Sequence, residues 1–219
     1  MKTCQMFVAV MIGLAGCSPE AEQVSAVVPD PELVAVRQAF TAYKTAILND
    51  DGDAAYALVD QNTRDWYAAS LDRALTWDRQ RVMQLGIMDK LQVFTIRHRI
   101  PRDELLQMTA ESLFTHATDQ GWVGKNSVSG LELGSIQVDG DFATGGIRNK
   151  GQDTPLKFHF YKEYGDWRID LTENNKLADT ALGLQVQKSG RTEMDYIFRV
   201  LEATSGRAVT ADVWTPPLE

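Results

Sequence analysis

The sequence is poor in the residues that build disulfide-linked or metal-centred scaffolds. Only two of its 219 residues are cysteine and three are histidine. Two cysteines cannot form the several bridges of a small disulfide-rich fold, and the two residue types together are too few for a structural zinc site made from them alone. An HExxH motif, or a comparable spacing of histidine and cysteine, is lacking as well. We therefore expect neither a metal nor another cofactor.

Basic residues are in the minority, with 22 Lys and Arg against 30 Asp and Glu and a formal net charge of −8. This excess of negative charge argues against binding to nucleic acid or, through charge, to an anionic membrane surface. An apolar run of the ~20 residues that a membrane-spanning helix needs is also lacking. The hydrophobic share of 44% is nevertheless ordinary for a globular protein, and the length predicts one domain with additional segments.

The N-terminus is typical of an export signal, because Lys2 precedes an apolar run over 6–15 that ends in small residues. Leu14-Ala15-Gly16-Cys17 resembles the lipobox of bacterial lipoproteins. That resemblance implies a diacylglyceryl group on the Cys17 thiol, cleavage before Cys17, and acylation of the new amine with a fatty acid such as palmitate. By the same resemblance, Ser18 implies the periplasmic face of the outer membrane. The alternative is an ordinary secretory signal that happens to contain a cysteine.

We predict four segments along the chain. Residues 1–16 are the signal peptide, and residues 17–30 are the lipidated cysteine with a flexible tether that can reach roughly 40 Å. Residues 31–172 form an α+β domain, and residues 173–219 form a C-terminal helical extension. The lipid on Cys17 makes the membrane the first expected partner.

The first part of the predicted domain is helical. Asp30 and Pro31 suit the cap and the first position of a helix, and its apolar stripe includes Phe40 and Tyr43. Further helices are expected from Asp53, from a cap at Asn62 through Leu71, over 79–91, and over 101–121, where Thr109 could divide the last one into two.

A change of period after residue 91 predicts a strand. Over Gln92–Ile100, four residues that include Phe94, Ile96 and His98 alternate with mostly polar ones, which is typical of a half-buried strand. Four more strands are expected over 131–138, 142–149, 156–161 and 167–171, followed by two helices, the second capped by Thr192. Helices followed by a hairpin-linked antiparallel meander define an α+β fold.

The order of these elements resembles the nuclear transport factor 2-like superfold, a cystatin-like α+β cone. The resemblance rests on the long first helix with Phe40 and Tyr43, the acidic glycine turn after it, the short second helix, and the final hairpin over 158–170. It covers residues 31–172 and implies N-terminal helices packed on a curved antiparallel sheet. The longer helical section before residue 121 and the C-terminal helices depart from the superfold, and either could close the mouth of the cone. The superfold hosts isomerases, cyclases and dehydratases as well as binding domains, so the fold does not decide the function.

His98 and Tyr43 are the candidate catalytic residues. His98 shares the apolar face of its predicted strand, where a neutral imidazole could act as a general base, although such a histidine more often forms a hydrogen bond within a core. Tyr43 lies on the helix that matches the one carrying a cavity tyrosine in isomerase-like members of the superfold. Those members also use paired acidic groups. Here two carboxylates cannot be placed on inward-facing strand positions, because Asp170 alternates away from Trp167 and Ile169, and this absence counts against the isomerase interpretation.

Trp122 and Trp214 are the candidate binding residues. Both lie in loop-like sequence, where a tryptophan would be an exposed anchor for a protein partner. Asp50, Asp51 and Asp53 resemble a calcium loop only faintly, and a turn between two helices explains them better.

The leading hypothesis is a lipid-anchored envelope protein without catalysis that binds a small apolar molecule or a protein partner. One alternative is an isomerase- or dehydratase-type enzyme that uses His98 with Tyr43 in a hydrophobic cavity. Another is a structural adaptor that acts through Trp214 and the C-terminal helices. The sequence leaves the choice between a monomer and a homodimer open.

Overall fold

The computed structural model describes residues 30–122, 125 and 128–218. The predicted signal peptide, the lipobox with Cys17 and the tether up to residue 29 lie outside the described residues. Within the described part of the chain, no helix is both long and apolar enough to cross a membrane.

The strands form one antiparallel sheet in which each strand pairs with the next along the chain. Over the described residues, the strands in order are β1 (Leu131–Asp139), β2 (Phe142–Asn149), β3 (Gln152–Glu163) and β4 (Asp166–Asp170). The predicted meander is therefore confirmed, and so is the tight turn between the first two strands. That turn contains Gly140 at a φ of 58°, a backbone conformation that glycine adopts without strain.

Helices precede and follow the sheet, so the predicted α+β class is confirmed. The carboxylate of Asp30 caps the first helix by accepting a hydrogen bond from the Glu32 N–H at 2.9 Å, as predicted. Thr109 divides the helical stretch before the sheet, also as predicted. The helices are α1 (Pro31–Leu48), α2 (Gly52–Ala57), α3 (Gln61–Thr76), α4 (Arg79–Val82), α5 (Ile87–Arg99), α6 (Arg102–Leu105), α7 (Ala110–Asp119), α8 (Asn175–Ser189), α9 (Glu193–Ser205) and the short 3₁₀ helix η2 (Ala211–Trp214).

The predicted strand over Gln92–Ile100 is wrong, because these residues belong to α5 and its C-cap. The physical reason is that α5 is buried on two sides. Ile96 belongs to the main core, whereas Val93 and Phe94 belong to a second core. A helix with two apolar faces lacks the single stripe of period 3.6, and its β-branched residues complete a false alternation.

The predicted cap at Asn62 is also wrong, since Asp60 caps α3 by accepting a hydrogen bond from the Thr63 N–H at 2.9 Å. The Asp60 N–H donates to the Ile169 carbonyl at 3.0 Å, which places the start of α3 against β4. The predicted helix over 79–91 is divided, because α4 ends at Val82 and α5 begins at Ile87.

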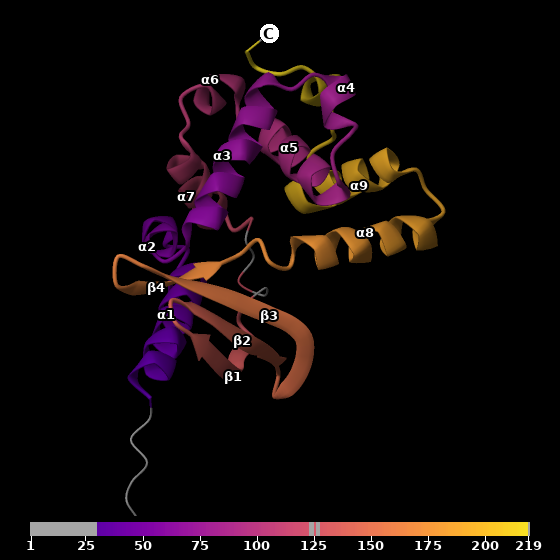
Figure 1. Ribbon diagram of the computed structural model, residues 1–219. Helices are drawn as coiled ribbons and strands as arrows, with labels where there is room; N and C mark the ends of the chain where they lie inside the picture. The colour runs from indigo at the N-terminus through magenta and orange to yellow at the C-terminus, as the bar shows by residue number, and fades with distance from the viewer. Residues whose placement is uncertain (1–29, 123–124, 126–127, 219) are drawn as a thin grey trace, which may run out of the picture.

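The main core lies between α1 and the sheet. α1 contacts β1 at one edge of the sheet and β4 at the other, so the helix crosses the face of the sheet (Figure 1). α2 packs against α1 and α7, and α7 in turn packs against α3. The buried side chains that meet between helix and sheet include Val36, Phe40, Tyr43, Ile47, Leu133, Ala143, Phe160, Trp167 and Ile169.

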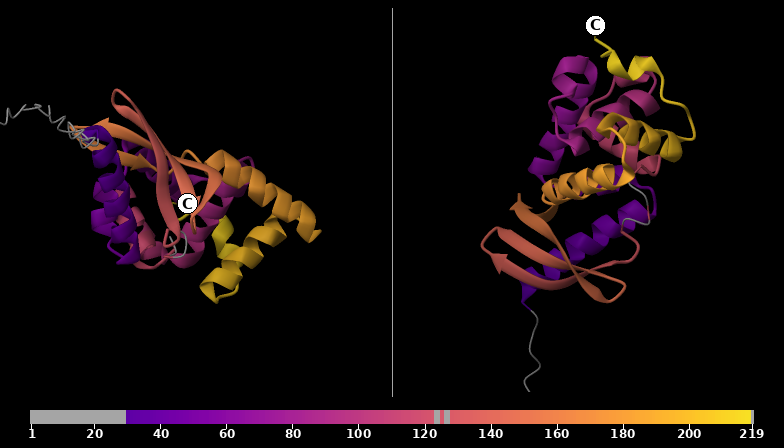
Figure 2. Two further views of the ribbon diagram at one scale, coloured as in Figure 1. Left: turned by 90° about the horizontal axis from the view of Figure 1, so that it is seen from below. Right: turned by 90° about the vertical axis from the view of Figure 1, so that its right-hand side faces the viewer.

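A second core forms where the C-terminal helices meet α4 and α5. α9 and η2 pack against α5, at the end of the molecule away from the sheet (Figures 1 and 2). Its buried members are Val82, Ile87, Val93, Phe94, Ile197, Leu201 and Val213. The C-terminal extension therefore supplies three of the seven buried members of this core, and α5 contributes to both cores.

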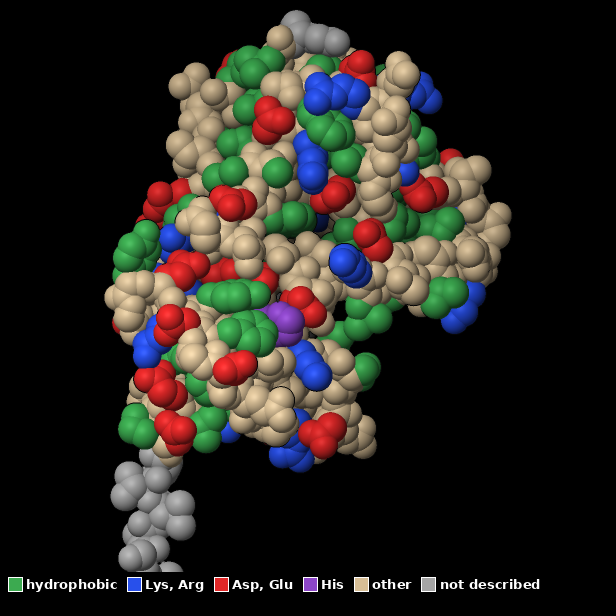
Figure 3. All heavy atoms as spheres, in the orientation of Figure 1, with side chains coloured by type: hydrophobic (Ala, Val, Ile, Leu, Met, Phe, Trp, Pro, Cys, Tyr) green, Lys and Arg blue, Asp and Glu red, His purple; other side chains and the backbone are tan. Residues whose placement is uncertain are grey.

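α8 contacts the body through Asp179 and through Leu182 and Val186, which pack against the second core, and its other face is exposed. Asp179 of α8 accepts a hydrogen bond from the Met88 N–H at 2.8 Å and so caps the start of α5. None of the residues of α8, all of which the structure describes, is buried, and Leu177 and Leu184 are 46% and 51% exposed. On the face shown in Figure 3, acidic and basic side chains are interspersed over the whole surface.

Candidate functional site

An aromatic pocket of about 270 Å³ opens between α1, α3 and the sheet. α1 and α3 place their aromatic residues toward it because these residues continue the buried faces of both helices. β1 and β3 provide aliphatic and aromatic residues from the opposite side. We call it the aromatic pocket; its lining is Tyr43, Trp66, Tyr67, Val128, Leu131, Phe158, Leu171, Thr172 and Asn175.

Tyr43 and Tyr67 are the polar groups deepest in the aromatic pocket. Their side chains are 3% and 6% exposed, and neither phenol hydroxyl forms a hydrogen bond with another described residue. Burial raises the pKa of both phenols, and for Tyr43 the neighbouring Tyr67 raises the pKa further. Both hydroxyls therefore stay protonated at physiological pH and can donate a hydrogen bond to a ligand.

Ring contacts hold the walls of this pocket in place. The Tyr67 ring packs edge-on against Trp66 at 5.1 Å and against Phe114 at 4.9 Å between ring centroids. On the other side, Phe158 contacts Phe40 at 5.6 Å. Such pairs add to the free energy gained from burial alone, so the pocket is preformed.

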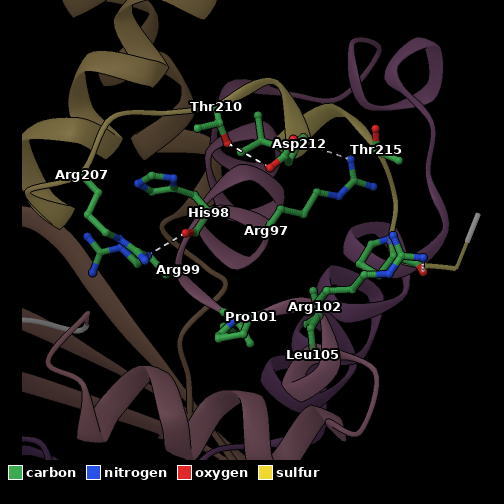
Figure 4. A pocket seen from close by; sticks show the side chains of 13 residues that line it. Arg97, His98, Arg99, Pro101, Arg102, Leu105, Arg207, Thr210, Asp212 and Thr215 are labelled. Carbon is green, nitrogen blue, oxygen red and sulfur yellow. Dashed lines mark hydrogen bonds between the residues drawn. The ribbon is translucent and has the colours of Figure 1, made fainter.

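His98 does not lie in the aromatic pocket. It is in the last turn of α5, where its Nε2 atom lies 2.8 Å from Ser205 Oγ, and it lines a separate cavity of about 650 Å³ with Arg99 and Arg207 (Figure 4). Burial lowers the pKa of His98, and the charges of Arg207 and Arg99 lower it further. The structure therefore separates His98 from Tyr43, and the two line different cavities.

The two candidate tryptophans are packed rather than exposed, which corrects the expectation that they are free anchors. Trp214 in η2 contacts Phe94 at 4.9 Å in the second core, and the Arg79 guanidinium lies 4.4 Å from its ring centroid. Trp122 contacts the main core, and its ring lies 5.2 Å from the guanidinium of Arg99.

Asp60 and Asp170, two carboxylates that the sequence analysis did not pair, are buried near each other. Asp60 and Asp170 are 1% and 4% exposed. Asp170 does alternate away from Trp167 and Ile169, as predicted, but its side of β4 is buried as well, because the start of α3 covers it and Asn62 Nδ2 lies 3.4 Å from an Asp170 oxygen. Asp170 also accepts hydrogen bonds from the N–H and the hydroxyl of Thr172, both at 2.7 Å. Burial, and to a smaller extent the Asp170 charge, raises the pKa of Asp60 despite the hydrogen bonds that Asp60 accepts.

The acidic turn after α1 connects two helices, as predicted. Asp51 caps α2 by accepting a hydrogen bond from the Ala54 N–H at 3.0 Å. Asp50 forms an ion pair with Lys125 at 2.6 Å, and Asp53 accepts a hydrogen bond from Thr115 at 3.1 Å. Across the residues that the structure describes, no three His, Cys, Asp or Glu side chains are grouped so that they could hold a metal ion.

The sequence interpretation missed Arg99 and Arg207 as site residues. They are 108 residues apart, and each is a charged residue at the end of a predicted element, where exposure to solvent is the ordinary expectation. The available signal was local only: three consecutive basic residues, Arg97-His98-Arg99, end two positions before Pro101 and the turn that it introduces.

We compared the chain with protein-family models, with curated proteins and with solved structures, and none of the three comparisons found a match. The likeness to the nuclear transport factor 2-like superfold therefore stays a prediction.

Proposed function

We propose that this protein is a lipid-anchored envelope protein without catalysis, attached through Cys17 to the periplasmic face of the outer membrane, and that its aromatic pocket binds a small, mostly apolar molecule. The tether before Asp30 would hold the domain away from the membrane. The proposed cone-like fold supports a ligand at this place, because a cone formed by a sheet around helices encloses its space between them.

The observation that carries the ligand is the lining of the aromatic pocket. Seven of its nine residues are aromatic or aliphatic, and only Thr172 and Asn175 are otherwise polar. Removing apolar surface from water contributes about 25 cal/mol per Å², so such a wall favours an apolar body. A volume of about 270 Å³ lies just below the ~300–1,000 Å³ of pockets for drug-sized molecules, which favours a compact ligand.

The two phenol hydroxyls define the polar part of that ligand. Tyr43 and Tyr67 each offer an O–H group that has no partner among the described residues. A polar group in an apolar pocket loses free energy unless it forms a hydrogen bond. We therefore expect the ligand to carry one acceptor, such as a carbonyl or ether oxygen, at the end that faces these hydroxyls.

Two probes of nearly the same shape test the proposal: naphthalene, and 2-acetylnaphthalene, which adds a carbonyl acceptor. Binding to the chain without its signal, residues 18–219, is measured by equilibrium dialysis. Saturable binding of both probes is expected. Tyr43→Phe should weaken binding of 2-acetylnaphthalene by about 2- to 10-fold, the contribution of one hydrogen bond, and should leave naphthalene unchanged.

A variant that fills the pocket, compared with the same substitution at an exposed position, gives a second test. Leu131→Trp places a larger side chain in the aromatic pocket and should abolish binding of both probes. The same substitution at the exposed Leu184 of α8 should change neither. Equal binding by the Leu131 and Leu184 variants would contradict the proposal. Native mass spectrometry of the protein purified without detergent would identify a natural ligand by its added mass.

The enzyme hypothesis loses its expected pair of residues, because Tyr43 and His98 line different cavities. A general base must lie within hydrogen-bond reach of the proton that it abstracts from a bound substrate. A substrate held in the aromatic pocket would therefore contact Tyr43 but not His98.

The adaptor hypothesis is favoured by one feature of α8. Leu177 and Leu184 are seven residues apart, which is about two helical turns, so they lie on the same face of α8. They are 46% and 51% exposed. A protein partner that contacts this chain through its C-terminal extension would cover these leucines, whereas Trp214, the anchor expected from the sequence, is already packed in the second core.

A further inference from the structure

The cavity at the C-terminal end of α5 has a charge opposite to that of the whole chain. It lies where α5, α6 and the segment after α9 meet, and it has a volume of about 650 Å³ (Figure 4). Among its lining residues, all of which the structure describes, four are arginines and one, Asp212, carries a carboxylate. The formal net charge of the chain is −8. This concentration of positive charge therefore requires an explanation.

Two of the four arginines hold the walls of the cavity together. The guanidinium of Arg97 donates to the carbonyls of Ala74 at 2.8 Å and of Val213 at 3.1 Å, and so connects α3 to η2. Arg102 donates to the carbonyl of Pro217 and connects α6 to the C-terminal segment. These two arginines therefore have a structural role, because they donate hydrogen bonds to backbone carbonyls of neighbouring elements.

The other two arginines, Arg99 and Arg207, are on the same side of the cavity as His98 (Figure 4). The guanidinium of Arg207 donates a hydrogen bond to the carbonyl of His98 at 2.8 Å. The Arg99 Nε atom is buried without a hydrogen-bond partner, and its guanidinium lies over the Trp122 ring. Neither arginine forms an ion pair with any residue that the structure describes.

The charges of Arg99 and Arg207 are therefore not paired with a carboxylate in the part of the chain that the structure describes. Burial, and then the charge of Arg207, lowers the pKa of Arg99. The nearby Glu202 raises the pKa of His98, but burial, Arg207 and Arg99 together outweigh it, so that the pKa is lowered. The C-terminal end of α5 attracts cations by only about 0.3–1 kcal/mol at an exposed site, and it accounts for one such contact, that of Arg207.

We propose that Arg99 and Arg207 bind the phosphate group of a small organic phosphate in this cavity. Guanidinium groups match the geometry of phosphate oxygens, and two of them balance the charge of about −1.5 to −2 that a phosphate monoester carries at pH 7. Ile100, Pro101, Leu105 and Val213 provide an apolar wall for the organic part. This site is separate from the aromatic pocket, so either proposal can fail without the other.

Ser205 connects His98 to the backbone of Arg207. Its Oγ atom lies 2.8 Å from His98 Nε2 and accepts a hydrogen bond from the Arg207 N–H at 3.2 Å. The backbone at the end of α9 is thereby fixed relative to the end of α5, and Arg207 follows Gly206, whose φ of 69° turns the chain toward the cavity.

Titration of the protein with phenyl phosphate at constant ionic strength, followed by calorimetry, tests the proposal. Saturable binding is expected, and Arg99→Gln and Arg207→Gln should each weaken it about tenfold or more, because each removes a hydrogen bond between charged groups. Arg191→Gln, at an exposed arginine after α8, removes the same charge and should change the affinity less than twofold. Equal affinities of all three variants would overturn the proposal.

A second readout does not depend on the variants folding. In the unsubstituted protein, the pKa of His98 measured by NMR should rise when phenyl phosphate is present, because a bound dianion offsets the charges of Arg99 and Arg207. The other charged groups near the imidazole, Glu202 and Asp212, are the same in both titrations. An unchanged pKa at saturating phenyl phosphate would overturn the proposal.

The source of the phosphate group is distinguished with vesicles. If phenyl phosphate binds and vesicles of phosphatidylglycerol do not compete with it, the ligand is a soluble phosphate ester. If the vesicles bind and Arg99→Gln and Arg207→Gln abolish this binding, the phosphate group belongs to a lipid headgroup. Absence of binding to both probes would overturn the proposal.

Discussion

At the scale of single residues, Asp60 has two roles with opposite effects on stability. Its carboxylate caps α3 through the Thr63 N–H, which stabilises the helix, and its burial beside Asp170 raises its pKa above the ordinary value of 3.8. A carboxyl whose pKa is higher in the folded state favours folding while it is protonated. That contribution is complete below pH 3.8 and is lost as the pH rises through the folded-state pKa.

Asp60→Asn should therefore become more stable relative to the unsubstituted protein as the pH rises. Asparagine caps a helix about as well as aspartate does but carries no charge. The measurement is urea unfolding of both proteins in steps from pH 3.5 to pH 7. At neutral pH, Asp60→Asn should be at least as stable as the parent, whereas Asp60→Ala should lose about 1 kcal/mol of the free energy of unfolding because the cap is lost. A pH-independent difference between Asp60→Asn and the parent would show that the carboxyl has no raised pKa.

Single residues also show why the candidate site was only partly predictable. Tyr43 could be found because it continues the stripe of one amphipathic helix, and a stripe is local information. Arg99 and Arg207 could not, since they meet only after α9 packs against α5. Trp214 was misjudged for the same reason: two prolines after it suggested a loop, while the second core that covers it is assembled from distant segments.

At the scale of elements, two glycines with opposite surroundings give a matched test of helix packing. Gly52 begins α2 where this helix contacts α7, and a Cβ atom at this position would lie 2.6 Å from the Cα and the carbonyl oxygen of Thr115. Gly183 lies inside α8, where a Cβ atom would meet nothing within 4 Å.

Gly52→Ala should lower the free energy of unfolding by about 1–3 kcal/mol, because backbone atoms must move apart. Gly183→Ala should raise it by about 0.5–1 kcal/mol, because alanine restricts the unfolded chain and favours the helix. Urea unfolding at neutral pH measures both. Effects of the same sign would show that the two glycines do not differ in packing.

The elements that the sequence predicted correctly are those with one burial environment. α1 buries a single face, and β2 alternates between buried and partly buried residues. α5 was taken for a strand because Ile96 and Phe94 face different cores, so that its apolar residues lack the single stripe of a one-sided helix and happen to alternate. The cap of α3 was misplaced by two residues because Asp60 acts jointly with a bond to β4, which is a tertiary contact.

At the scale of the whole molecule, the C-terminal extension is part of the folded body. Deletion of residues 191–219 would remove Ile197, Leu201 and Val213, which are 1%, 1% and 2% exposed, from the second core. We expect the shortened chain to unfold at lower urea concentration and to bind a dye for exposed apolar surface. Unchanged unfolding would show that the second core contributes no stability.

For this reason the deletion cannot test the adaptor hypothesis, since a lost complex would also follow from loss of structure. Leu177→Ser with Leu184→Ser removes the exposed leucines of α8 and leaves both cores intact. Each surface substitution should change the free energy of unfolding by less than about 0.5 kcal/mol. Loss of a native complex by this variant would support the adaptor, and retention of the complex would contradict it.

The burial of α5 in two cores has a consequence for how this chain can change over evolutionary time. A substitution on an ordinary surface helix affects the packing of one core. A substitution on one side of α5 moves a helix whose other side packs in the second core. Two compensating changes, one in each core, would be needed to accept it. Among descendants of a common ancestor, α5 should therefore diverge most slowly, and the exposed residues of α8, a helix with no buried residue, should diverge faster.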